Sequence, residues 1–175
     1  MIPDLQKIML PVLQILGDKN EKNVSDIRAH IASTFQVTEE EQRQKTPSGK
    51  QNLFYNRVAW SVAYLKMANL IYSEQRSIYE VIQEGLELLQ KKPESISVKL
   101  LKSIPEFREK VSPNKKQDPI LEDDPVESNA PDELIEIGYN KIREELVNQL
   151  LDMIKANSPS FFENLVIDRK YSVSF

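Results

Sequence analysis

The chain of 175 residues contains no cysteine and a single histidine, His30. The absence of cysteine excludes disulfide bonds and thiolate chemistry, and it is typical of proteins of the reducing cytoplasm. A protein metal site would need oxygen ligands almost exclusively, and no loop clusters Asp and Asn residues as calcium and magnesium sites do. We therefore expect this chain to bind no metal and no other cofactor.

Long apolar runs are also missing. No stretch of about 18 apolar residues occurs, which predicts that no segment crosses a membrane. The first residues, 1–4, lack the basic region and apolar core of a secretory signal. The sequence has no glycine-rich phosphate loop, no Ser/His/Asp set and no internal repeat. With 40% hydrophobic and 29% charged residues, it predicts a cytoplasmic globular protein of one or two small domains without a membrane partner.

Charge is unevenly distributed. The net charge of −4 argues against a nucleic-acid partner, but residues 1–92 carry 12 Lys and Arg against 11 Asp and Glu. Residues 93–175 carry 11 against 16. Within 45–76 only Glu74 opposes five basic residues, which are Lys45, Lys50, Arg57, Lys66 and Arg76. Because salt limits the reach of a charge to about 8–10 Å, this local excess predicts salt-sensitive phosphate contacts.

The first 92 residues have the element order of a winged helix-turn-helix domain. Apolar residues at helical spacing predict a helix over 3–17, interrupted or kinked at Pro11. Ser25 is placed to cap a second helix, and Thr38 and Glu41 have the spacing of a capping box. A third helix is predicted over 48–68, ended by a left-handed Asn69. Its expected core stripe comprises Phe54, Val58, Trp60, Ala63, Tyr64, Met67 and Ala68.

Two β-prone runs follow that helix, at 70–73 and 77–81, and predict a hairpin that would form the wing. A short helix over 84–92 closes the unit. The predicted fold class is therefore mainly α, or α+β. It consists of a winged helix-turn-helix domain over 1–92, then a flexible acidic linker and a C-terminal helical segment.

The remaining chain divides into three parts. Residues 93–111 are predicted to form a helical or irregular tail. Residues 112–131 contain four prolines and five acidic residues, so we expect a flexible linker. Residues 132–157 within the last segment, 132–175, have the spacing of a long amphipathic helix, which is a candidate dimer seam or packing helix. A short helix is expected over 158–167.

The start of the third helix holds the candidate DNA-binding residues. Backbone N–H groups at a helix start, together with basic side chains, favour phosphate. Amide side chains can pair with adenine edges, and arginine with guanine, when the helix enters the major groove. The predicted contacts are Ser48, Gly49, Lys50, Gln51, Asn52, Tyr55, Asn56 and Arg57, with Arg76 at the tip of the wing. The alternative is an ordinary solvated helix start, and burial of this region or its coverage by the acidic linker would contradict the DNA assignment.

The sequence contains no catalytic constellation that we can assign. Asp168-Arg169-Lys170 matches a fragment of the nuclease pattern of acidic groups and a lysine around a divalent metal. No acidic residue on a predicted strand lies at a suitable distance upstream, so we interpret this match as coincidental. No residue is therefore predicted to be catalytic.

Several stretches resemble the N-terminal domain of the Mrr family of restriction-system proteins. They are Pro11-Val12-Leu13, Pro47-Ser48-Gly49-Lys50-Gln51, Asn56-Arg57-Val58-Ala59-Trp60, residues 65–71 and residues 79–85. The helix around Phe162-Glu163 resembles the first helix of that family's catalytic domain. The resemblance implies a type IV, modification-dependent endonuclease, in which a winged helix reads methylated foreign DNA and a PD-(D/E)xK domain cuts it with magnesium.

The chain departs from that family pattern in three places. Asn69 replaces a usual glycine at the helix end, and Ile82 replaces a usual capping threonine. The glycine-rich Asp and Gln-x-Lys segments of the catalytic domain are absent after Ile167. We therefore expect a truncated catalytic domain, no DNA cleavage by this chain alone, and a magnesium requirement only for the family's catalytic domain.

Three functions remain open from the sequence. The favoured one is the DNA-binding module of an Mrr-like restriction endonuclease, with helix 48–68 in the major groove and the wing at 70–81. The alternatives are a winged-helix transcription regulator and a protein–protein dimerisation module. The expected partners are double-stranded DNA, methylated in the family's substrates, and a second copy of the chain in a homo-oligomer.

Overall fold

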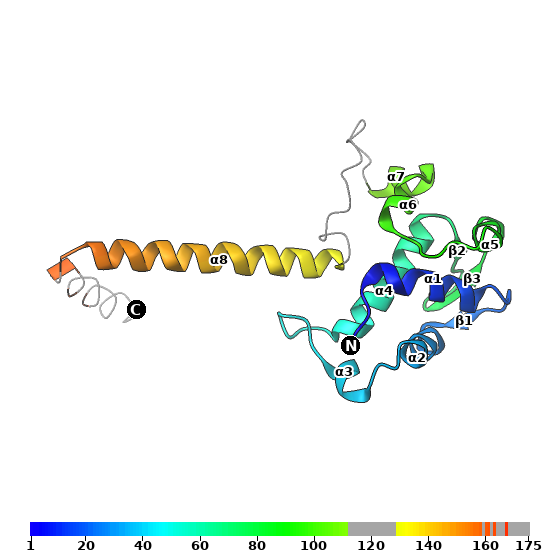
Figure 1. Cartoon of the computed structure of the whole chain (residues 1–175), viewed down its shortest axis with the longest axis horizontal. Helices are drawn as coiled ribbons and strands as arrows, with labels where there is room; N and C mark the ends of the chain where they lie inside the picture. Colours follow the sequence, from blue (N-terminus) through cyan, green and yellow to red (C-terminus); the bar gives the residue numbers. More distant parts are fainter. Residues whose placement is uncertain (112–128, 159, 162, 164–166, 168–175) are drawn as a thin grey trace. The chain divides into compact units, whose positions relative to one another are not determined.

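The computed structural model describes residues 1–111 and 129–158, together with residues 160, 161, 163 and 167 (Figure 1). The chain divides into two compact units, Met1–Leu134 and Ile135–Phe175. The predicted linker at 112–131 falls mostly outside the described residues, as do five of the ten residues of the short helix expected at 158–167.

Helix α1 (Leu5–Leu16) forms where the sequence predicted it, with Pro11 inside the helix. The Asp4 carboxylate caps it by accepting a hydrogen bond from the Lys7 N–H at 2.9 Å. One face is completely buried, and it consists of Leu5, Ile8, Met9, Val12, Leu13 and Leu16. Because these residues recur at intervals of three and four, one side of the helix forms the centre of the core.

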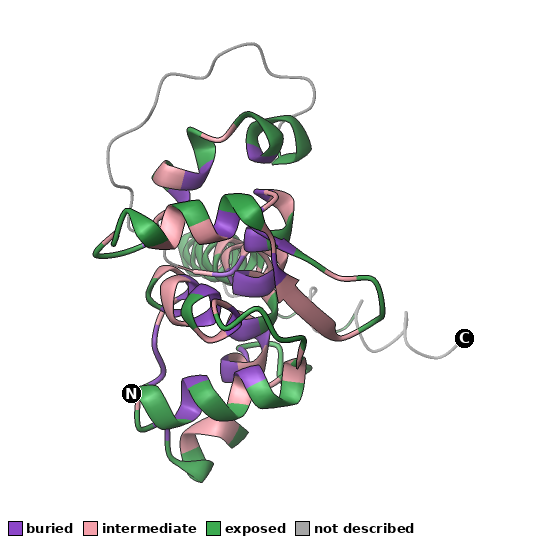
Figure 2. Ribbon diagram, turned by 90° about the vertical axis from the view of Figure 1, so that its right-hand side faces the viewer, coloured by how far each residue is buried: buried purple, intermediate pink, exposed green. Residues whose placement is uncertain are grey.

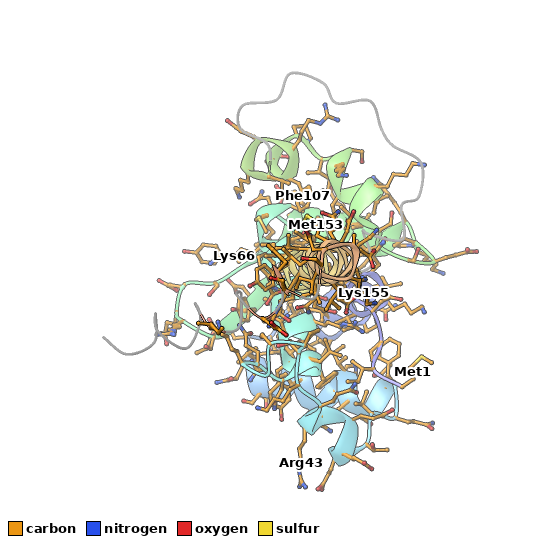
Figure 3. All side chains as sticks on the ribbon, turned by 90° about the vertical axis from the view of Figure 1, so that its left-hand side faces the viewer. Met1, Arg43, Lys66, Phe107, Met153 and Lys155 are labelled. Carbon is orange, nitrogen blue, oxygen red and sulfur yellow. The ribbon has the colours of Figure 1, made fainter. Side chains whose placement is uncertain are left out.

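Two shorter helices follow. In α2 (Val24–Thr34), Ile27 and Ile31 are buried as predicted, but the cap is Asn23 rather than Ser25. The Asn23 side chain accepts from the Ser25 N–H at 3.1 Å. The capping box of α3 (Glu39–Arg43) is confirmed, with Thr38 and Glu41 each bonded to the other's backbone N–H. Figure 3 shows Arg43 pointing away from this helix into solvent.

Helix α4 (Leu53–Met67) differs from the prediction in its start and in its buried face. It begins five residues later than expected, because residues 45–52 close on themselves as a separate loop. Its buried apolar residues are Phe54, Val58, Val62 and Leu65. The predicted stripe is therefore confirmed at Phe54, Val58 and Ala68. Its other members, Trp60, Ala63, Tyr64 and Met67, are half-buried, because the buried face runs through Val62 and Leu65.

A three-stranded antiparallel sheet has the order β1-β3-β2. The predicted hairpin is confirmed as β2 (Ile71–Tyr72) paired with β3 (Ile78–Val81), with Ile71 opposite Val81. Strand β1 (Lys22–Asn23) pairs with the other edge of β3 and was not predicted, since two residues carry no periodicity. Asn69 is left-handed, with φ of 55°, as expected at a helix end. The mainly helical fold with this small sheet is consistent with a winged-helix-like domain.

The segment predicted as a tail, 93–111, is helical and belongs to the core of the first unit. After α5 (Gln83–Gln90) come α6 (Val98–Lys102) and α7 (Pro105–Val111). Ile96, Leu101 and Phe107 are completely buried, and Figure 2 colours the ribbon by burial. Their burial makes 93–111 a structural part of the N-terminal unit.

Helix α8 (Pro131–Ala156) confirms the long helix predicted at 132–157. Within the second unit its large apolar side chains are exposed, among them Ile135, Tyr139, Ile142, Leu146, Leu150 and Met153. No described residue of that unit covers this face, so the predicted dimer seam or packing face stays a prediction. In the described part of the chain, no helix is both long and apolar enough to cross a membrane.

Acid should weaken one turn of this fold. The Asp18 carboxylate accepts hydrogen bonds from Lys22 Nζ at 2.5 Å and from the Asn20 N–H at 3.0 Å. These bonds, the one from Lys22 first, lower the pKa of Asp18 from 3.8 to about 2. A lowered pKa stabilises the folded state above the unfolded value, and the benefit is lost as the pH falls from about 4 to about 2. At pH 6, we expect the Asp18→Asn variant to unfold at a slightly lower urea concentration than the unchanged protein. Near pH 2, the two proteins should unfold at the same urea concentration. A constant difference across this range would contradict the assignment.

Candidate nucleic-acid interface

Helix α4 follows α2 and α3 in the chain, and the β2–β3 hairpin follows α4 directly, an order consistent with a winged-helix-like domain. In proteins of this architecture the recognition helix and the hairpin face DNA. The connection between α2 and α4 is long, because it contains α3 and the loop 45–52. This loop projects beyond the first turn of α4 (Figure 1).

The loop 45–52 is a small hairpin of its own. Lys45 pairs with Asn52 in an isolated antiparallel bridge, and the Thr46 N–H donates to the Gln51 carbonyl at 2.9 Å. A tight turn follows Thr46, whose carbonyl accepts from the Gly49 N–H at 2.8 Å. Gly49 has φ of 72°, a conformation that glycine adopts without strain. Lys50 and Gln51 are exposed on this loop.

This geometry corrects the prediction for Ser48 and Gly49. They do not lie at a helix start, so the helix dipole of α4 does not act through their N–H groups. Asn52 is the N-cap residue of α4 instead, and its side chain makes no capping hydrogen bond. The sequence suggested otherwise because Ser48 resembles a helix cap, whereas the turn at Gly49 and the bridge at Asn52 delay the helix.

Tyr55 is half-buried beside a basic residue that the sequence analysis did not select. The Arg28 guanidinium carbon lies 4.7 Å from the centre of the Tyr55 ring, in cation–π contact. Arg28 Nε is buried without a hydrogen-bond partner among the described atoms. Its position on α2 gave no signal in the sequence, because only the tertiary fold brings α2 beside the start of α4.

Asn56 and Arg57, predicted as DNA contacts, are largely buried and are paired within the chain. Asn56 is 5% exposed, and its Nδ2 donates to Asp132 Oδ1 at 3.0 Å. Arg57 forms an ion pair with Glu133, with Nε–Oε1 and Nη2–Oε2 distances of 2.9 and 2.8 Å. The segment that follows the acidic linker thus covers these two side chains, which is the arrangement that would argue against their contact with DNA.

The remaining predicted contact lies on the hairpin. Arg76 is exposed in the connection between β2 and β3, next to Ser77, which has φ of 68°. The structure therefore leaves Lys50, Gln51 and Arg76 accessible and engages Asn56 and Arg57 internally. Among the residues described, no group of three or more His, Cys, Asp and Glu is placed to hold a metal ion.

Comparison with known proteins agrees with this architecture. The family model of the Mrr N-terminal domain matches residues 5–91. The chain is also 22% identical over 175 residues to the type IV methyl-directed restriction enzyme EcoKMrr of Escherichia coli strain K12. That match covers 95% of this chain and 58% of the relative, so the chain spans little more than half of the relative's length. No solved structure gives a significant match. Residues 5–91, with helices α1 to α5 and the three-stranded sheet, therefore belong to the Mrr N-terminal domain family.

Proposed function

We propose that residues 1–111 bind double-stranded DNA as the recognition module of an Mrr-like, methylation-dependent restriction system. The observation that carries this proposal is the accessible basic loop, 45–52, in front of α4. Lys45 and Lys50 lie exposed on it, and Arg76 is exposed on the hairpin that follows α4. Basic side chains on these two projections can pair with phosphates of a duplex.

The acidic net charge of the chain does not oppose this proposal. Screening confines each charge to its surroundings, so the phosphates respond to the charges of the loop and hairpin rather than to the total of −4. The relative EcoKMrr is a methyl-directed restriction enzyme, which supports methylated duplex DNA as the ligand. We propose that binding takes place in the cytoplasm and needs no divalent cation, so EDTA should leave it unchanged.

Removing the exposed cations should weaken DNA binding. We expect Lys50→Ala with Arg76→Ala to lower the affinity for a short duplex about tenfold at physiological salt. Each lost phosphate contact should also reduce the slope of log K against log salt by about one. Fluorescence anisotropy with a labelled duplex at several salt concentrations measures both quantities.

A matched control is Lys99→Ala with Lys102→Ala, which removes the same charge from α6. Its affinity and salt slope should stay close to those of the unchanged protein. Equal losses in both double variants would show a general charge effect, and no loss in the first would refute the assigned surface.

A preference for the methylated over the unmethylated duplex favours the restriction role, whereas indifference to methylation favours a transcription regulator. A stable dimer without DNA affinity would favour a dimerisation module.

A further inference from the structure

Within the first unit, residues 130–134, the returning segment, cover the start of α4. We propose that Asp132 and Glu133 form an autoinhibitory contact there, which DNA must displace before Asn56 and Arg57 can take part in binding. This inference rests on the proposed function, because the displacing ligand is duplex DNA.

The ion pair between Arg57 and Glu133 has the geometry of a phosphate site that is already filled. Two parallel N–H groups of the guanidinium point at the two oxygens of one carboxylate. A phosphate group accepts the same bidentate pair of bonds from arginine. The side chains are 14% and 5% exposed, so the carboxylate excludes both water and other anions from this guanidinium.

The protein holds this guanidinium in place from the other side. Arg57 Nη1 donates to the backbone carbonyls of Pro3 at 3.2 Å and Ile2 at 3.4 Å. These bonds do not depend on Glu133, so Arg57 stays oriented when the carboxylate leaves. A bidentate donor of fixed direction suits an incoming phosphate or guanine edge.

Asn56 points outward from α4, and its amide Nδ2 donates a hydrogen bond to Asp132 Oδ1. It lies two residues from both Phe54 and Val58, which places it on the opposite side of the helix from the core. Nothing about the packing of α1 against α4 therefore requires Asn56 to be buried. Its 5% exposure reflects coverage by the returning segment, and its amide would otherwise face solvent in the position of a base-reading side chain.

The returning segment is built as the start of a helix. Pro131 is the first residue of α8, and Asp132 and Glu133 lie in its first turn. Pro and acidic residues are favoured at these positions, so helix formation presents the two carboxylates together. Ala130 is completely buried and Glu133 is 4% exposed, whereas Ile135 is 73% exposed. Within the first unit the contact is made by a few residues at the start of α8, so only a small area must separate when it opens.

The size of the inhibition follows from the population of the open form. When only a fraction of molecules is open, the apparent affinity falls by that fraction. A contact that keeps nine molecules in ten closed would weaken DNA binding about tenfold. The connection through the chain makes this competition intramolecular, so an individually modest contact suffices.

Neutral isosteres of the two carboxylates test the proposal. We expect the double variant Asp132→Asn with Glu133→Gln, in the full chain, to bind a short duplex about tenfold more tightly than the unchanged protein. The control variant, Glu144→Gln with Asp152→Asn, alters the net charge equally at exposed positions of α8 and should change affinity less than twofold. Equal affinities in the unchanged protein and in the first variant would overturn the inference and leave the proposed function standing. Equal gains in both variants would also overturn it, whereas no binding by any protein would overturn the proposed function itself.

A second measurement needs no DNA. Because the chain has no native cysteine, Asn56→Cys introduces a unique thiol under the returning segment, and Ala59→Cys introduces an exposed one on the same helix. We expect maleimide to label position 56 at least tenfold more slowly than position 59. Adding Glu133→Gln should bring the two rates close together. Equal rates with Glu133 intact would show that the segment does not cover α4, and would overturn the inference.

Discussion

Replacing Phe107 by alanine should lower the free energy of unfolding of the N-terminal unit by about 3–5 kcal/mol. Phe107 is completely buried, and its ring meets the Tyr64 ring edge-on, with 5.5 Å between their centres. Removing it leaves a cavity between α7 and α4, where Figure 3 labels the side chain. Urea denaturation followed by circular dichroism measures the change.

The control for this substitution lies on the same helix. Val111 is 44% exposed, so Val111→Ala should change the free energy of unfolding by less than about 0.5 kcal/mol. If Phe107→Ala were equally mild, α7 would not belong to the core of the unit. The comparison therefore tests whether residues 93–111, which lie outside the matched family domain at 5–91, are a structural requirement of it.

Replacing Gly85 by alanine should cost about 2 kcal/mol, although alanine normally favours a helix. A Cβ atom at this position of α5 would lie 2.2 Å from the Leu70 carbonyl oxygen and 2.8 Å from Val81 Cγ2. The carbonyl belongs to backbone at the start of the hairpin, so α5 must move away from the sheet. The loss should appear as a lower midpoint of thermal or urea unfolding.

Gly138→Ala is the matched control for that experiment. A Cβ at position 138 of α8 would meet no atom within 4 Å. The substitution should make helix formation in α8 more favourable by up to about 1 kcal/mol. It should leave the free energy of unfolding of Met1–Leu134 unchanged. A similar loss in both variants would contradict the close approach at Gly85.

The elements with strong periodicity or caps were predictable. The spacing of Leu5, Ile8 and Val12 identified α1, and the Thr38–Glu41 capping box identified α3. The hairpin and the left-handed Asn69 also followed from local residue types. Strand β1 did not, because its two residues form a strand only through pairing with β3.

The candidate site also contains residues that local sequence predicts and residues that only tertiary contacts reveal. Residues such as Lys50 and Arg76 were recognisable as exposed cations, because hydration keeps unpaired charges at the surface. The start of α4 was misplaced, since the hydrogen bonds that close the loop 45–52 are not encoded by any single cap residue. The contact of Arg28 with Tyr55 was not predictable either, because it joins two different helices.

Local sequence thus determined the helices, the hairpin, the concentration of positive charge in 45–76 and the family of residues 5–91. Only the tertiary structure decided which face of α4 is buried, that residues 93–111 complete the core, and that Asp132 and Glu133 pair with Asn56 and Arg57. The physical reason is the separation along the chain over which each kind of interaction acts. Helix caps and periodicity act over a few residues, whereas a contact across 76 positions depends on how the whole chain folds.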